Sequence, residues 1–135
     1  MSRFPRISDA RRTSLLLSVF LVGCASSDRA LVTGQALRYD GSPLIGATVT
    51  ARSNETGAWA SGITDAEGRF ALSAQTPGEG LPAGDYYVVI LEDRGDANQR
   101  PATIPAKYST ATASGLSLKV EQGQSREMNI KLDAA

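Results

Sequence analysis

The chain has 135 residues with a single cysteine, no histidine, and 14 basic against 14 acidic residues. One domain is the expected organisation at this length. Without histidine the usual general base, the Ser-His-Asp and Cys-His nucleophiles and most zinc sites are excluded. Lys and Arg form no run, so the sequence offers no basic patch of the kind that binds nucleic acid.

The first residues differ from the rest of the chain. Residues 1–12 carry four Arg against one Asp, and residues 15–22 form an apolar run. Eight residues are too few to cross a bilayer, which needs about 20 in a helix. A basic stretch, a short apolar stretch and then small residues is the order of a secretory signal. A short amphipathic or buried helix is the alternative.

The apolar run ends in Leu21, Val22, Gly23 and Cys24. This order resembles the bacterial lipobox, in which a leucine, a small or apolar residue and a glycine or alanine precede the cysteine. The resemblance implies that the Cys24 sulfur receives a diacylglyceryl group, that the signal is cut before Cys24, and that the new amine is acylated. A small buried hydrophobe or a free thiol is the alternative for a lone cysteine.

Acylation predicts a membrane-anchored protein. One acyl chain binds a bilayer only marginally, whereas two or three on Cys24 would hold the protein stably. Residues 1–23 are then the signal, 24–30 a lipidated tether and 31–133 the domain. Cleavage removes four Arg and one Asp, which leaves 10 basic and 13 acidic residues, a net charge of −3. We expect the cell membrane or outer membrane as the location, with the domain outside the cytoplasm.

Short β-strands separated by Gly, Pro, Asp and Asn are predicted for the domain. They cover residues 31–39, 47–52, 59–64, 69–73, 85–92, 115–121 and 126–132. Most alternate apolar and polar residues and so bury one face, whereas 86–91 is apolar on both faces, as expected of a central strand. Seven such strands predict an all-β fold, a seven-stranded antiparallel β-sandwich.

Four segments in this order resemble the carboxypeptidase regulatory-like domain. They are Val32-Thr33-Gly34, residues 40–49 (DGSPLIGATV), residues 64–70 (TDAEGRF) and residues 82–88 (PAGDYYV). Residues 104–108 and 114–116 further resemble short planctomycete lipoproteins of this type. The resemblance implies a prealbumin-like (transthyretin-like) or Ig-like sandwich that serves as an accessory module. The hydrolase branch of the transthyretin-like proteins relies on histidine, which this chain lacks.

Two places offer side chains for binding. Residues 93–113 form a loop longer than compact domains usually contain, with Arg100, Lys107 and Tyr108 among its residues. The tyrosine can stack on a sugar or peptide and the cations can meet acidic groups, unless Tyr108 packs the loop onto the sandwich. Trp59 lies amid small residues, where it either packs or presents an exposed aromatic ring.

The acidic residues favour structural roles. Asp65 and Glu67 lie in a tight turn that is too short for a calcium loop, and the acidic residues of 92–96 are expected in a solvated loop. An isopeptide bond between Lys119 and Asn129, on predicted neighbouring strands, is disfavoured because Lys119 faces outward. We therefore predict no catalytic residue, metal or cofactor.

Two functions are consistent with these features. The first is a non-enzymatic envelope lipoprotein, a structural or interaction module that binds protein or glycan near the membrane. The second is a small-ligand or carbohydrate-binding protein that uses a pocket between the sheets or the loop end. Neither involves nucleic acid, and the sequence leaves the oligomeric state open.

Overall fold

The computed structural model describes residues 29–76 and 78–135. The predicted signal, the lipobox of Leu21, Val22 and Gly23, and Cys24 lie outside these ranges. The strands are β1 (Val32–Leu37), β2 (Thr48–Arg52), β3 (Trp59–Ile63), β4 (Arg69–Leu72), β5 (Gly84–Leu91), β6 (Leu116–Val120) and β7 (Arg126–Lys131), with two 3₁₀ turns, η2 (Asp96–Asn98) and η3 (Ala106–Ser109). Within the described ranges, no helix has the length and apolar character needed to span a bilayer.

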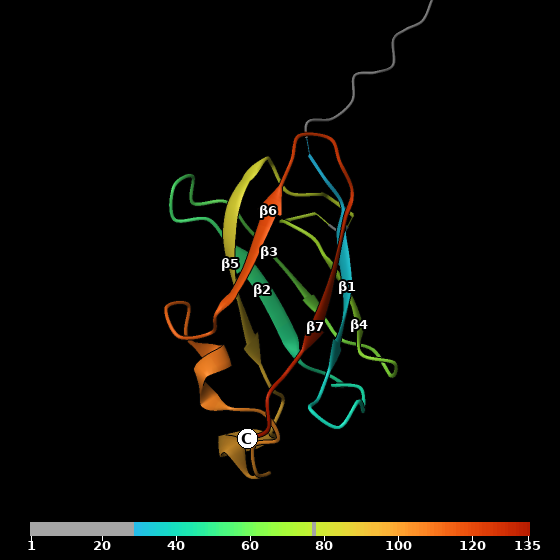
Figure 1. The fold of residues 1–135 in the computed structure, drawn as a ribbon, viewed down its shortest axis with the longest axis vertical. Coiled ribbons are helices and arrows are strands. Elements are labelled where there is room, and N and C mark those ends of the chain that lie inside the picture. The colour runs from blue at the N-terminus through green and yellow to red at the C-terminus, as the bar shows by residue number, and fades with distance from the viewer. Residues whose placement is uncertain (1–28, 77) are drawn as a thin grey trace, which may run out of the picture.

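The strands form two stacked sheets, which confirms the β-sandwich (Figure 1). One sheet has the order β4-β1-β7 and the other the order β3-β2-β5-β6. The prediction that all strands are antiparallel is wrong, because β1 and β7 pair in parallel. The turn at 121–125 carries the chain from one sheet to the other, so β7 joins the three-stranded sheet beside β1 instead of pairing with β6.

That crossing also corrects the expected neighbours of β6. Lys119 lies on β6 in the four-stranded sheet, and Asn129 lies on β7 in the three-stranded sheet. Both are exposed and their strands are not neighbours, so the arrangement gives no basis for an isopeptide bond between them. Alternation along a strand predicts which way a side chain faces but not which strand lies beside it.

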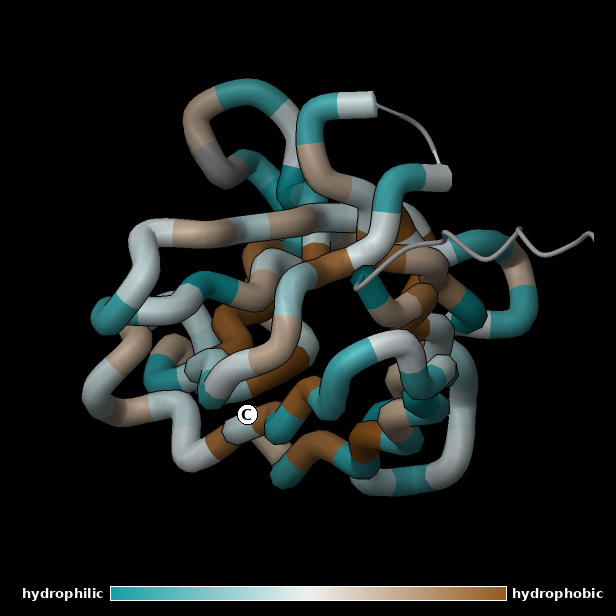
Figure 2. The backbone as a smooth tube through the Cα atoms, turned by 90° about the horizontal axis from the view of Figure 1, so that it is seen from above, coloured by the Kyte–Doolittle hydropathy of each residue, from teal (hydrophilic) through white to brown (hydrophobic). Residues whose placement is uncertain are grey.

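The core fills the space between the sheets. Every strand contributes buried residues to it, and in Figure 2 many of the hydrophobic segments lie toward the middle of the molecule. Ala47, Val49 and Ala51 are fully buried, as their alternation predicts. The partners that complete the layer include Phe70, Leu72, Tyr86, Val88, Ile90, Leu118, Val120, Ile130 and Leu132.

The turns use the residues that the sequence marks. Gly41 and Gly68 have φ angles of 88° and 79°, in the left-handed region that favours glycine. The Asp40 carboxylate accepts the Ser42 N–H at 3.0 Å, and the Asp65 carboxylate accepts the Glu67 and Arg69 N–H groups, both at 2.9 Å. Asp65 is thereby occupied in closing a turn, as expected.

The two ends of the sandwich differ. β1 begins at the end that carries the 121–125 turn, whereas η2, η3 and the C-terminus lie at the opposite end (Figure 1). The predicted long loop, residues 93–113, therefore contains two 3₁₀ turns. Ile104 and Tyr108, each only 4% exposed, fasten it to the core.

Candidate binding face

The outer face of the four-stranded sheet carries a row of large side chains at one level. Arg52 on β2 pairs with Trp59 on β3 and with Tyr87 on β5, and Tyr87 pairs with Ser117 on β6. The residues that follow or precede them in each strand are buried, so these four side chains point outward. We call them the aromatic row. Neighbouring strands are about 4.8 Å apart, which places the Trp59 and Tyr87 backbones about 10 Å apart with Arg52 between them.

The polar atoms of the aromatic row have no partners in the described part of the chain. Within it, neither the Arg52 guanidinium, the Trp59 indole N–H nor the Tyr87 hydroxyl makes a hydrogen bond, ion pair or ring contact. Trp59 is 47% exposed, and Tyr87 is partly exposed. These groups are free to meet a ligand, and the indole and phenol combine an apolar body with a donor.

The next two levels of the same face change in character. The row of Ser61, Thr50 and Val89 adds two hydroxyl groups beside the aromatic row. Beyond it, Ile63 and Leu91 flank Thr48 and are 68% and 52% exposed. The face is thus polar and aromatic at one end and aliphatic at the other, which we call the aliphatic end. Large exposed apolar side chains gathered on one face are typical of interaction surfaces.

A hollow adjoins the edge of the sheet next to Trp59. It has a volume of about 290 Å³ and is lined by residues of the 57–59 and 74–82 segments, Trp59 and Pro82 among them, together with Arg29. A ligand on the aromatic row could therefore extend past β3. Of the two alternatives for Trp59, packing or an exposed aromatic ring, the structure favours the second, since almost half of its surface is open.

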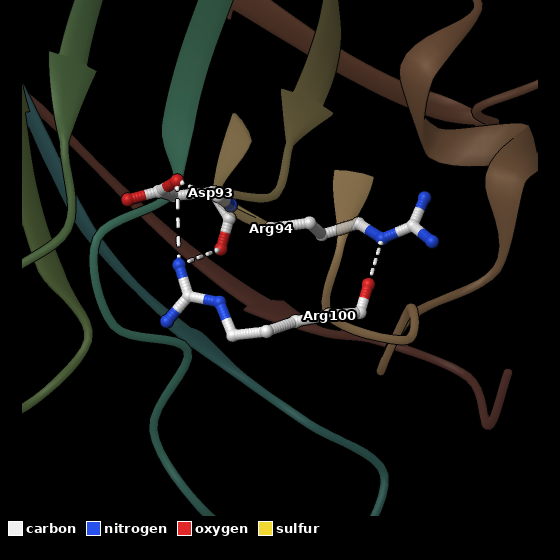
Figure 3. A network of polar contacts seen from close by, with 4 residues as sticks. Asp93, Arg94 and Arg100 are labelled. Atoms are coloured by element: carbon white, nitrogen blue, oxygen red, sulfur yellow. Dashed lines mark hydrogen bonds and ion pairs between the residues drawn. The ribbon is translucent and has the colours of Figure 1, made fainter. Parts of the chain in front are cut away.

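Arg100, a predicted binding residue, contacts Asp93 and Arg94 of its own loop (Figure 3). Its guanidinium donates to the Asp93 carbonyl at 3.1 Å and lies 3.5 Å from the Asp93 carboxylate. The Arg94 guanidinium donates to the Arg100 carbonyl at 2.8 Å. The two arginines hold the ends of the 93–100 segment together, which accounts for their positions without a ligand.

Lys107 and Tyr108 fasten the C-terminal segment. The Lys107 ammonium lies 2.6 Å from the Asp133 carboxylate, and the Asp133 N–H donates to the Tyr108 hydroxyl at 3.0 Å. The hydrogen bond to Asp133 raises the pKa of Lys107, and the same bond lowers the pKa of Asp133. Because the Tyr108 ring is buried, it presents no face for stacking, and the packing alternative describes it.

Glu92 was expected in a solvated acidic loop, but its carboxylate is bonded within the fold. Its carboxylate accepts the Thr103 N–H at 3.0 and 3.1 Å and also the Thr103 hydroxyl, which in turn receives the Arg38 Nε–H at 2.9 Å. These contacts join the loop to the end of β1. In the part of the chain that the structure covers, no three acidic, cysteine or histidine residues are grouped to hold a metal ion.

Sequence reasoning singled out Trp59 but missed Arg52 and Tyr87. Tyr87 lies in a strand that is apolar on both faces, and such a strand is expected to be covered on both sides. In the structure only Tyr86, Val88 and Ile90 face the core, while Tyr87 faces outward. Arg52 ends an alternating strand and looked like an ordinary solvent-facing residue. Only the register brings the three together.

Comparisons with known proteins support the fold alone. No family model and no curated protein matches the chain. Among solved structures, the Bacillus anthracis TIE protein is similar over 80% of this chain and 17% of its own, with a TM-score of 0.52 and 17% identity.

Two other solved structures are similar with lower TM-scores. A DUF3823 family protein from Parabacteroides merdae is matched over 81% of this chain and 48% of its own, at 14% identity and a TM-score of 0.45. BcpA, the major pilin subunit of Bacillus cereus, is matched over 79% and 30%, at 15% identity and 0.45. The chain spans less than half the length of each of these three proteins.

Proposed function

We propose that this chain is a non-enzymatic, lipid-anchored module of the cell envelope that binds protein or glycan through the outer face of its four-stranded sheet. The observation that carries the proposal is the exposure of Trp59, Ile63 and Leu91 on one sheet face, at 47%, 68% and 52%. Exposing so much apolar surface in water is unfavourable, and a partner that covers it regains that free energy.

The anchor is supported by the lipobox at residues 21–24 and by its closeness to the domain. Among the described residues, backbone hydrogen bonds to the rest of the fold begin at Ala30, six residues after Cys24 in the sequence. Six residues span at most about 20 Å, so a lipid on Cys24 would hold the β1 end of the sandwich close to the bilayer. The loop end would then point outward, and the sheet face would stand to the side, open to neighbouring envelope polymers.

The finer assignments form part of the same proposal. The order of turn and strand motifs favours a carboxypeptidase regulatory-like domain in a short planctomycete-type lipoprotein, and the location would be the cell membrane or outer membrane. The alternative of a ligand pocket at the loop end has less support, because Arg100, Lys107 and Tyr108 are engaged with their own loop and with the C-terminal segment.

Trp59 provides the test, since it is the only tryptophan of the chain. We expect its fluorescence to shift to the blue, and to become protected from acrylamide quenching, when the purified full chain is titrated with an envelope extract separated into protein and polysaccharide fractions. An unchanged Trp59 signal with both fractions would contradict a binding role for this face.

A further inference from the structure

We propose that the aromatic row binds an acidic polysaccharide, with the carboxylate of a uronic acid on Arg52 and sugar rings against Trp59 and Tyr87. This inference rests on the proposed function, since it names the ligand class of the same sheet face. It follows from the position of one unpartnered cation between two unpartnered aromatic side chains in a single register row.

The spacing of the row suits a sugar chain. Trp59 and Tyr87 are two strands apart, about 10 Å, and Arg52 is halfway between them. A pyranose ring presents C–H groups on its faces, which pack on an aromatic ring, and hydroxyl groups around its rim. The hydroxyl of Ser117 lies in the row and those of Ser61 and Thr50 lie beside it, where they can donate to and accept from that rim.

The charge of the face favours an acidic chain over a neutral one. The guanidinium of Arg52 forms a planar fork that matches a carboxylate with two parallel hydrogen bonds. Lys119 adds a second cation on the same face, where it lies opposite the carboxylate of Asp85 in the register. The predicted mature chain carries a net charge of −3, which repels polyanions in general, so retention by an acidic polymer would require a local site.

The same features argue against a second copy of the chain as the occupant. An interface built by stacking two such faces about an axis near the aromatic row would place two Arg52 side chains close to each other, and Asp85 already lies opposite Lys119 in its own sheet. Burying like charges unpaired costs free energy. A protein partner would make its main apolar contacts at the aliphatic end, around Ile63 and Leu91, rather than on the hydroxyl-rich end of the face.

The test is a titration of the purified full chain with polygalacturonate oligosaccharides, followed by Trp59 fluorescence and by calorimetry. The control ligand is the same oligosaccharide with its carboxyl groups reduced to alcohols. We expect the acidic form to bind about tenfold more tightly or better, because hydrogen bonds to charged groups are the stronger ones. Arg52→Gln should lower the affinity for the acidic form to that for the reduced form, and Trp59→Ala, followed by calorimetry, should remove binding of both.

Arg126→Gln is the matched control, since Arg126 is exposed on β7 of the other sheet. It removes the same charge from the chain, and we expect it to leave both affinities unchanged. An equal loss in the Arg52 and Arg126 variants would show an effect of net charge and overturn the inference. Equal binding of acidic and reduced sugars, or full binding by the Arg52 variant, would overturn it as well.

Further outcomes separate this inference from the proposed function. If no sugar binds while the envelope protein fraction shifts Trp59 fluorescence, the ligand is a protein, and the inference fails while the proposed function holds. If sedimentation shows a dimer that Trp59→Ala dissociates, the occupant is a second copy, and the inference also fails. If Trp59 responds to no fraction, both fail together.

Discussion

Replacing Gly34 with alanine should destabilise the fold far more than its single methyl group suggests. Gly34 lies in the middle of β1, between β4 and β7. A Cβ built there would be 2.0 Å from the Met128 carbonyl oxygen on β7 and 2.6 Å from Phe70 Cζ on β4. Carbon atoms pack at about 3.5–4.0 Å, so the new methyl is about 1 Å too close to Phe70 Cζ, and it lies closer still to the Met128 carbonyl oxygen.

The two neighbours cannot both move at low cost. Met128 belongs to the β1–β7 ladder, so shifting its carbonyl weakens hydrogen bonds worth about 0.5–1.5 kcal/mol each. Phe70 is buried, and overpacking a core costs about 1–3 kcal/mol. We therefore expect Gly34→Ala to lower the free energy of unfolding by about 3 kcal/mol. With a urea m-value of about 1.5 kcal/mol per M, the unfolding midpoint falls by about 2 M.

Gly41→Ala is the matched control for the Gly34 measurement. Gly41 has a φ angle of 88°, but no atom lies within 4 Å of a Cβ built on it. Its replacement should cost only the left-handed backbone penalty, about 1–2 kcal/mol. Urea unfolding followed by circular dichroism measures both variants. A Gly34→Ala variant no less stable than Gly41→Ala would refute the argued closeness of β1, β7 and Phe70.

Three further changes test other contacts. Ala97 has a φ angle of 53°, which is strained for a residue with a Cβ, so Ala97→Gly should raise the free energy of unfolding, measured by urea titration, by about 1 kcal/mol. A less stable Ala97→Gly variant would contradict this strain. Tyr86→Phe should lower it by about 1 kcal/mol, because the phenol donates to the Pro82 carbonyl at 2.6 Å; an unchanged urea midpoint would speak against that bond. The Lys107 ammonium lowers the pKa of Asp133 in the folded state, so the pair stabilises the fold above the unfolded carboxyl pKa of about 3.9 and loses this effect as the pH falls through the folded pKa. Asp133→Asn should therefore reduce the fall of the melting temperature with decreasing pH in the acid range. A variant whose melting temperature falls as steeply as that of the wild type would count against the pair.

The strands and turns of this fold could be read from the sequence because their causes are local. Alternation in 47–52 and 116–120 predicts the buried face, and Asp65 before Gly68 predicts a turn. The parallel pairing of β1 and β7 could not be predicted, because it depends on which sheet the chain joins after residue 125. Pairing between strands far apart in sequence is set by the packing of the whole domain.

The candidate face shows the same division. Trp59 stands out in the sequence as a lone aromatic among small residues, but its exposure depends on the absence of a covering segment over β3 among the described residues. Tyr87 looked like a core residue because no local signal tells a strand covered on both sides from one covered on a single side. Arg100 and Lys107 looked available because their partners, Asp93 and Asp133, are set by the folding of the loop and the C-terminal segment.

The proposed presentation of this face at the membrane depends on attachment through Cys24. Metabolic labelling of cells with a radioactive or clickable palmitate, followed by capture of the protein, measures it directly. We expect a labelled, membrane-fractionating protein, and a Cys24→Ser variant that loses the label and is left uncleaved or soluble. Labelling that is unchanged in the Cys24→Ser variant, or a wild-type protein that carries no label, would contradict it.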